Sequence, residues 1–200
     1  MTYHLSLHEI LQSYLEDLYL PYTQEIKQSL LFYQNEHYGE LYYYSFQTLI
    51  RHLELSKLDH FLDIGSGLGK IVLQTFLSTD VAAVSGIEIN LLRYQIASKV
   101  VETIRQTLPN LFTPSRTLEL LHGDFLHYTW QHITVIYVCS TVFSSTLLEN
   151  LGKKISTLPH VRCVASLRKL PHLHHFVLSK KIFLHADWER VPCYIYTRTR

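Results

Sequence analysis

The sequence predicts an α/β fold with a mostly parallel sheet, preceded by a helical segment. Three observations carry this prediction. From residue 60 onward, short β-rich runs alternate with stretches of helical periodicity, which is the pattern of βαβ units. The first of these runs leads into a turn that is rich in glycine. In the first 55 residues, by contrast, apolar side chains recur at helical spacing.

Residues 1–55 form the expected N-terminal helical segment. Leu7, Ile10 and Leu11 lie on one face of an amphipathic helix, and Pro21 ends that stretch. We expect helices over residues 5–19, 23–33 and 43–53.

Residues 56–200 form the expected α/β domain. Its first five strands are predicted in the runs FLDI, VAAVSGIE, TLELL, ITVIYV and VRCVAS, with helices over residues 69–78, 90–108 and 143–157. After Pro171 no long helical pattern follows, and the runs HHFVLSKKIFLH and VPCYIYTRT predict two final strands. We expect these to pair antiparallel, joined near residues 186–190.

Composition excludes a disordered or fibrous chain, because 47% of the 200 residues are hydrophobic. No run approaches about 18 uninterrupted apolar residues, and the N-terminus lacks the pattern of a secretory signal. We therefore expect a cytoplasmic or nuclear protein that does not act on membranes. Cys139, Cys163 and Cys193 lack the close spacing of metal or redox motifs, so we expect them to be buried. His172 and His174 would share one face of a strand, but no third ligand is evident and no metal site is predicted.

The charge is divided unevenly along the chain. Residues 1–150 carry 8 Lys and Arg against 15 Asp and Glu, whereas residues 151–200 carry 10 against 2. This basic C-terminal quarter suggests contact with a polyanion; the alternative is a set of solvated lysines at strand edges.

The glycine-rich turn FLDIGSGLGK limits the ligands that the chain could bind. It has a GxGxG pattern at Gly65, Gly67 and Gly69, whereas a dinucleotide fingerprint would need glycine where Lys70 stands, and a P-loop motif is absent. Asp63, just before the turn, would repel a phosphate and attract an ammonium group. The pattern therefore favours S-adenosylmethionine, with a purely structural tight turn as the alternative.

Acidic residues at the ends of the next two strands support this interpretation. Glu88 could accept hydrogen bonds from both ribose hydroxyls, or it could instead support the start of the following helix. Asp124 could accept a hydrogen bond from an adenine amino group, and the Phe125 ring could lie against the purine. Six of the seven glycines, at positions 39, 65, 67, 69, 86 and 123, are expected in the loops around this ligand.

With these residues in view, the chain resembles the DOT1 family of histone lysine methyltransferases. The resemblance covers about residues 35–197 and consists of HYGEL, DIGSGLGKIVLQ, GIE, GDFL, ITVIYVCSTVF and VPCYIYT. It implies the Rossmann-like, seven-stranded class I methyltransferase fold, and transfer of a methyl group from S-adenosylmethionine to a lysine nitrogen. It also implies a protein substrate, such as histone H3 or another basic protein, and makes a nucleosome or nucleic acid a candidate partner of the basic C-terminal quarter.

The resemblance implies roles for individual residues of this chain. The YGE element, Tyr38, Gly39 and Glu40, corresponds to a loop that folds over the cofactor. Asp63, Gly65 and Gly67 fall at the methionine end, Glu88 at the ribose, and Asp124 with Phe125 at the adenine. The full expected cofactor site is Tyr38, Gly39, Glu40, Asp63, Gly65, Ser66, Gly67, Gly69, Lys70, Glu88, Asp124 and Phe125.

The chain also departs from the family pattern. Lys70 stands where the family has glutamine, Leu41 where it has a hydroxyl residue, and Cys139 with Ser140 where it has asparagines near the target lysine. The expected substrate channel consists of Tyr42, Ser140, Phe143 and Trp188, with Tyr43 and Tyr194 as further candidate walls; Trp188 matches a family tryptophan near that channel. The missing asparagines keep two alternatives open: a class I methyltransferase that acts on RNA or a small molecule, and a cofactor-binding module without activity.

Overall fold

The computed structural model describes residues 5–31 and 39–199. Seven strands form one sheet in the order β3-β2-β1-β4-β5-β7-β6. The five strands β1 (His60–Ile64), β2 (Ala83–Glu88), β3 (Thr117–His122), β4 (Val135–Val138) and β5 (Cys163–Ser166) are parallel, whereas β6 (Phe176–His185) and β7 (Arg190–Arg198) form an antiparallel hairpin next to β5. The predicted α/β fold with antiparallel C-terminal strands is confirmed.

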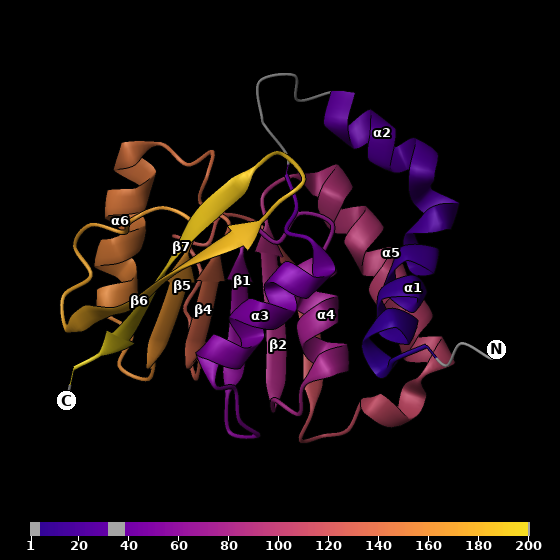
Figure 1. Cartoon of the computed structure of the whole chain (residues 1–200), viewed down its shortest axis with the longest axis horizontal. Helices are drawn as coiled ribbons and strands as arrows, with labels where there is room; N and C mark the ends of the chain where they lie inside the picture. Colours follow the sequence, from indigo (N-terminus) through magenta and orange to yellow (C-terminus); the bar gives the residue numbers. More distant parts are fainter. Residues whose placement is uncertain (1–4, 32–38, 200) are drawn as a thin grey trace.

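Helices cover the two faces of this sheet unequally (Figure 1). One apolar core joins the sheet to α3 (Tyr43–Leu53), α4 (Lys70–Ser78) and α5 (Leu91–Thr107). The second core, on the opposite face, contains only one helix of the described chain, α6 (Ser145–Ser156), together with residues from the loop after β3. The face of the β6–β7 hairpin beyond α6 therefore lacks a helical cover within the described residues.

The N-terminal helices pack beside α4 and α5. Helix α1 (Leu7–Tyr19) begins with a capping box, in which Ser6 and Glu9 exchange side-chain and backbone hydrogen bonds. A short 3₁₀ turn (Leu20–Tyr22) leads into α2 (Thr23–Leu31). At the end of α1 the buried Tyr19 hydroxyl donates to the carbonyl oxygen of Leu68 at 2.8 Å, which fixes the helix beside the glycine-rich turn. None of the helices in the described part of the chain has the length and apolar character needed to cross a bilayer.

Residues 39–42, which we call the strap, run between α4 and the turn of the β6–β7 hairpin. The backbone N–H of Tyr42 donates to His185 at 3.0 Å, Leu41 forms an isolated β-bridge with Ala186, and the N–H of Asp187 donates to Glu40 at 3.0 Å. These backbone contacts join two segments that are about 145 residues apart in the chain.

Several expectations about local structure are wrong. His172 and His174 lie in turns before β6 and not on a strand face; His172 has φ 57°, which is incompatible with extended backbone. Within the described residues, neither histidine belongs to a group of three potential metal ligands. Gly86 lies within β2 and not in a loop, and a Cβ there would meet Val72 at 2.7 Å, so this glycine allows α4 to pack closely on the strand.

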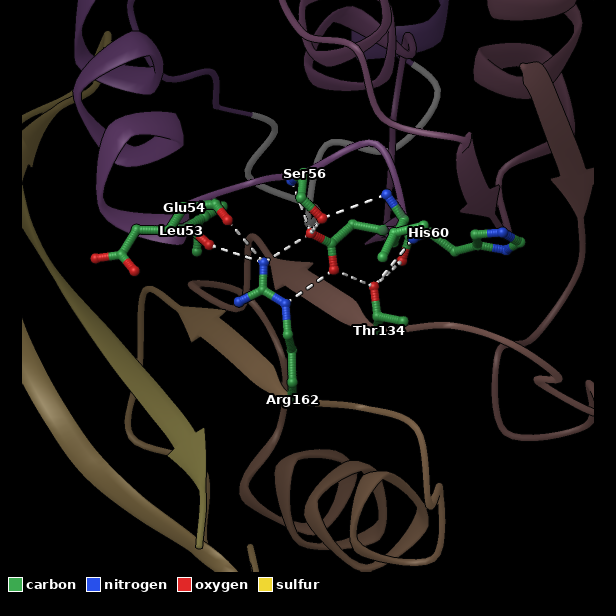
Figure 2. Close-up of polar contacts among 8 residues, drawn as sticks. Leu53, Glu54, Ser56, His60, Thr134 and Arg162 are labelled. Carbon is green, nitrogen blue, oxygen red and sulfur yellow. Dashed lines mark hydrogen bonds and ion pairs between the residues drawn. The ribbon is translucent and has the colours of Figure 1, made fainter. Parts of the chain in front are cut away.

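An ionic network between the buried Asp59 and the partly exposed Arg162 lies at the end of the sheet at which the parallel strands begin (Figure 2). Asp59 accepts two hydrogen bonds from the Arg162 guanidinium, both at 2.8 Å, and one from Thr134 at 2.7 Å. Ser56 adds two more donors, its backbone N–H at 2.8 Å and its hydroxyl at 2.9 Å. Burial alone would raise the pKa of Asp59, but these hydrogen bonds outweigh burial and hold the pKa well below its ordinary value.

Candidate active site

A cavity of about 940 Å³ opens at the carboxyl ends of the parallel strands, where β1, β2 and β4 end. Its walls come from α1, the strap, the glycine-rich turn and the loops after β2, β3 and β4. A crevice at the carboxyl ends of the strands is where open α/β sheets bind their ligands.

The glycine-rich turn forms the floor of this cavity. Gly65, Gly67 and Gly69 have φ values of 77°, 55° and 78°, a region that other residues adopt only at a cost. The backbone N–H groups of Gly65 and Ser66 both donate to the carbonyl oxygen of Ile87, which ties the turn to β2. Gly65, Ser66 and Gly67 line the cavity, whereas Gly69 does not and serves as the N-cap of α4.

Glu88, at the end of β2, fixes the turn from the opposite side. One carboxylate oxygen accepts from the N–H of Gly67 and the other from the N–H of Asn90, both at 2.7 Å. Asn90 in turn caps α5 by accepting from Leu92 and Arg93. Both sequence-based interpretations of Glu88 are therefore compatible, because each oxygen keeps a second lone pair for a ligand and the side chain lines the cavity.

Asp63 differs from Glu88 in having an unsatisfied oxygen. Its side chain is 2% exposed, lines the cavity, and has one carboxylate oxygen without a hydrogen-bond partner in the described structure. Burial, with a contribution from the negative charge of Glu88, raises the pKa of Asp63 well above its ordinary value. A buried acid in this state is a strong binding position for a cation that can donate hydrogen bonds.

Asp124 and Phe125 bring the third strand's loop to the cavity. One oxygen of Asp124 accepts from the N–H of Leu126 at 2.9 Å, and the side chain lines the cavity. The Phe125 ring lies nearly parallel to that of Phe143, with centroids 6.2 Å apart and planes 13° apart. The two rings form one aromatic wall, and Phe143 also limits the space above Gly65, where a Cβ would approach its ring to 3.4 Å.

The strap closes the cavity next to α4. The Lys70 ammonium forms an ion pair with the Glu40 carboxylate and lies 5.2 Å from the centre of the Tyr19 ring. Gly39 lies directly under the Trp188 indole, since a Cβ on Gly39 would fall 2.1 Å from that ring. Gly39, Glu40 and Lys70 line the cavity, whereas Tyr38 lies outside the described residues.

The expected substrate channel is only partly assembled. Tyr42, Tyr43 and Phe143 line the cavity, but Ser140, Trp188 and Tyr194 do not. Ser140 is fully buried, with its hydroxyl 2.7 Å from that of Ser166 and accepting from the N–H of Arg168, so it faces away from the cavity. Cys139 lines the cavity instead, and burial, followed by the charge of Asp63, raises its pKa to about 11.

A family model described as histone methylation protein DOT1 matches residues 19–187, which is most of the chain. The chain belongs to the DOT1 family. The resemblance in the sequence motifs is thereby confirmed.

Two relatives of this DOT1-family chain are described as histone-lysine N-methyltransferases specific for lysine 79 of H3. The protein of Drosophila melanogaster is 28% identical over 151 residues, which are 74% of this chain and 8% of that protein. The protein of Caenorhabditis elegans is 21% identical over 164 residues, or 79% and 17% of the two chains. The DOT1-family chain therefore spans only a small part of these relatives.

Solved structures share the fold of this DOT1-family chain at low sequence identity. A protein of Pyrococcus horikoshii described as a putative RNA methyltransferase has a TM-score of 0.62 at 11% identity, with 98% of this chain and 100% of that chain covered. The TrmK protein of M. capricolum, in complex with S-adenosyl-homocysteine, has a TM-score of 0.58 at 14% identity, with 80% and 70% covered. These structures confirm the methyltransferase-type fold class.

Sequence reasoning assigned no site residue to α1, yet Gln12, Leu15, Glu16 and Tyr19 all line the cavity. It also passed over Gln74 of the IVLQ motif, whose amide donates to the carbonyl oxygen of Tyr43 at 2.8 Å. This bond joins α4 to the start of α3 beside the strap. The IVLQ motif after the glycine-rich turn was the available signal for Gln74, but only the fold shows that its side chain binds the backbone of Tyr43.

Proposed function

We propose that this DOT1-family chain is an S-adenosylmethionine-dependent methyltransferase that methylates a lysine side chain of a protein, with histone H3 as the candidate substrate. The observation that carries the proposal is the buried, unsatisfied carboxylate oxygen of Asp63 in the cavity beside the glycine-rich turn. The family membership supports the same reaction.

The residues of the cavity fit the cofactor at its ammonium group, its ribose and its adenine. Asp63 would receive the ammonium of the methionine end, which supplies both a positive charge and hydrogen-bond donors. Glu88 would accept from the ribose hydroxyls through its remaining lone pairs. Asp124 would accept from the adenine amino group, and Phe125 would contact the purine. Gly65 has a φ of 77°, which favours glycine, so the turn borders the cavity at this position without a side chain.

In this proposal the N-terminal segment covers the cofactor and the rest of the chain binds it. Residues 1–55 provide α1 and the strap as a cover, and residues 56–200 provide the sheet and the loops that hold the cofactor. The strap residue Glu40 is held by its ion pair with Lys70 and by two hydrogen bonds with Asp187. Its backbone N–H donates to the Asp187 carboxylate, and its carbonyl oxygen accepts from the Asp187 N–H. For Tyr38, the first residue of the YGE element, a role in this cover stays a prediction from the family resemblance, because it lies outside the described residues.

The chain would promote methyl transfer through desolvation and alignment. The cofactor, when bound, supplies an electrophilic methyl group on a positively charged sulfur. A lysine must reach it as a neutral amine, although its ordinary pKa is about 10.4. Tyr42, Tyr43 and Phe143 line the cavity and would disfavour the ammonium form, so that the proton leaves to solvent before the nitrogen attacks carbon and the carbon–sulfur bond breaks.

Cys139 would stay inert in this reaction. A thiolate beside a methyl donor would compete with the lysine nitrogen, but the Cys139 pKa of about 11 keeps the thiol protonated. The exchange of a family asparagine for Cys139 therefore removes a side-chain amide from the cavity without adding a nucleophile.

The same exchange favours a second candidate, methylation of RNA or a small molecule. A cavity wall of Cys139, Thr141 and Phe143 offers fewer hydrogen bonds to a lysine than asparagines would, and it accepts flat or apolar substrates. A binding module without catalysis is the remaining alternative.

Incubation with radiolabelled S-adenosylmethionine separates these candidates. The protein is mixed in parallel with total histones, with histone H3 alone and with total RNA, and Glu88→Ala serves as the cofactor-binding control. Label on a lysine, located by mass spectrometry and absent with Glu88→Ala, supports the proposal. Label on RNA alone contradicts it. Calorimetric binding of S-adenosylhomocysteine with no labelled product from any mixture identifies a non-catalytic module.

A further inference from the structure

The β6–β7 hairpin exposes one face of the sheet next to the cavity mouth. It lies at the end of the sheet opposite α5 (Figure 1). Helix α3 contacts β6 on the opposite face, and α6 belongs to the core on the face described here. In the pairing of the two strands, Lys181 stands opposite Tyr194, Phe183 opposite Pro192 and His185 opposite Arg190. Because side chains two residues apart share a face, these residues all lie on the side of the sheet that carries α6.

Cations and aromatic rings alternate on this face. The Lys181 ammonium lies 5.1 Å from the centre of the Phe183 ring and 5.6 Å from that of Tyr194. The Arg190 guanidinium lies 4.8 Å from Phe183, and the Lys169 ammonium 5.9 Å from Tyr194. We call Lys169, Lys181, Phe183, Arg190 and Tyr194 the basic-aromatic face. Phe183 keeps 49% of its surface exposed between two cations.

The charge of this face is of one sign. Between residues 178 and 196, the side chains that the described strands direct to this side include no aspartate or glutamate. The nearest acids stand at its borders: Asp187 and Glu189 in the hairpin turn, and Glu149 in a shallow groove of about 520 Å³ that Lys169 also lines. Three cations on an open, partly apolar surface form a site for an anionic partner.

The basic-aromatic face is joined directly to the wall of the cavity. Tyr194 pairs with Ser166 at the end of β5, and the Ser166 hydroxyl lies 2.7 Å from that of Ser140. Residues 139 and 141, on either side of Ser140, line the cavity. The side chain of Arg168 donates to the carbonyl oxygen of Phe143, which connects the loop carrying Lys169 to the same wall. A partner bound on this face would therefore lie beside the cavity mouth.

We propose that the basic-aromatic face binds single-stranded nucleic acid. Lys169, Lys181 and Arg190 would contact successive phosphates, while an unstacked base would lie on the exposed Phe183 ring. An acidic peptide would match the charge, but it has no flat group for the ring between the two cations. This binding site goes beyond the proposed methyl transfer, because it needs neither the cofactor nor a lysine.

Fluorescence polarisation of a labelled single-stranded oligonucleotide of about 16 nucleotides, without cofactor, tests the proposal. With three phosphate contacts, the logarithm of the association constant should fall with the logarithm of salt concentration with a slope of about −2. Lys181→Gln should reduce this slope by about 0.7, because one phosphate contact is lost. Phe183→Ala should weaken binding about 10-fold and leave the slope unchanged, because stacking releases no counterions.

Lys57→Gln is the matched control, since Lys57 is an exposed cation just before β1, at the end of the sheet at which the parallel strands begin. It should leave affinity and slope as they are. Thermal unfolding of each variant shows that the fold is kept, and Arg190→Gln replaces Lys181→Gln if the latter is destabilised. The proposal is overturned if the oligonucleotide does not bind at low salt, if Lys57→Gln weakens binding as much as Lys181→Gln, or if a polyglutamate peptide binds more tightly than the oligonucleotide. Each of these results leaves the methylation assay unaffected.

Discussion

Replacing Asp63 by asparagine should make the ligand-free protein more stable and its cofactor binding weaker. The carboxylate is 2% exposed, one of its oxygens has no partner in the described structure, and the charge of Glu88 acts on it. Asparagine keeps the shape and removes the charge. An unpaired buried polar group costs about 1–3 kcal/mol, so relieving part of this cost should raise the melting temperature by about 2–4 °C per kcal/mol in a chain of this size.

Binding should change in the opposite direction. A hydrogen bond between charged groups contributes about 1.5–3 kcal/mol, so Asp63→Asn should weaken S-adenosylhomocysteine binding about 10- to 150-fold. This ligand carries the same ammonium as the cofactor and undergoes no reaction, and calorimetry measures its affinity directly.

The pH dependence gives a further check on the same residue. Because the pKa of Asp63 is raised in the folded protein, its contribution to stability is complete below the unfolded-state pKa of about 3.9 and is lost as the pH rises through the folded-state pKa. The gain in melting temperature from Asp63→Asn should therefore grow as the pH rises. An ammonium ligand favours the ionised carboxylate, so ligand binding to the unmodified protein should release protons, visible as a buffer-dependent binding enthalpy.

Asp80→Asn removes the same charge from an exposed loop position and should change neither stability nor affinity. The reasoning fails if Asp63→Asn lowers the melting temperature of the ligand-free protein, or if the variant binds S-adenosylhomocysteine as tightly as the original chain does.

Two further substitutions test the other ionic contacts. Lys70→Gln breaks the ion pair with Glu40 in the strap. Because the two side chains are 42% and 26% exposed, we expect a loss of stability below about 1 kcal/mol, but several-fold weaker binding of S-adenosylhomocysteine. The control Lys99→Gln breaks an ion pair outside the cavity and should not affect binding. Asp59→Asn should destabilise the protein by about 1–3 kcal/mol in urea unfolding at neutral pH, because the buried carboxylate that accepts from Arg162 is lost. The Arg162 side chain is 42% exposed, so solvent stabilises the charge that remains. The effect of Asp59→Asn should fade as the pH falls below about 4, where the lowered pKa of Asp59 makes the original chain lose the same stabilisation. An unchanged urea midpoint for Asp59→Asn, or unchanged ligand affinity for Lys70→Gln, would contradict these assignments.

The sequence predicted the sheet, most helices and the loops that line the cavity, because these depend on local periodicity and on short motifs. The GxGxG turn at residues 65–69, Glu88 at the end of β2 and Asp124 after β3 lie around one cavity, because the carboxyl ends of parallel strands meet at the same end of the sheet. Strand limits were less accurate: β2 begins at Ala83 and β5 at Cys163, two residues later than the apolar runs begin. The first residues of these runs, Val81 and Val161, are buried but lie outside the strands.

Contacts between distant segments could not be predicted in this way. The pairing of Lys70 with Glu40, the position of Trp188 on Gly39 and the approach of α1 to the cavity depend on how the strap crosses the hairpin turn. Ser140 shows the same limit on a smaller scale. It adjoins two cavity-lining residues in the loop after β4, but its hydroxyl contacts that of Ser166 and faces away from the cavity.

Asp59 and Asp63 show how one short strand supports both stability and function. They lie four residues apart, just before β1 and near its end, and both are at most 3% exposed. Asp59 accepts five hydrogen bonds, so its pKa is lowered and the ionised form stabilises the fold (Figure 2). Asp63 lacks such donors on one oxygen, and its pKa is raised. Burial raises the pKa of each acid, and the negative charge of Glu88 adds to this at Asp63, whereas the donors around Asp59 outweigh burial there. A chain that satisfies one buried acid fully and leaves the other short of a partner raises the free energy of the second acid in its ionised form, and a cationic ligand in the cavity would lower it.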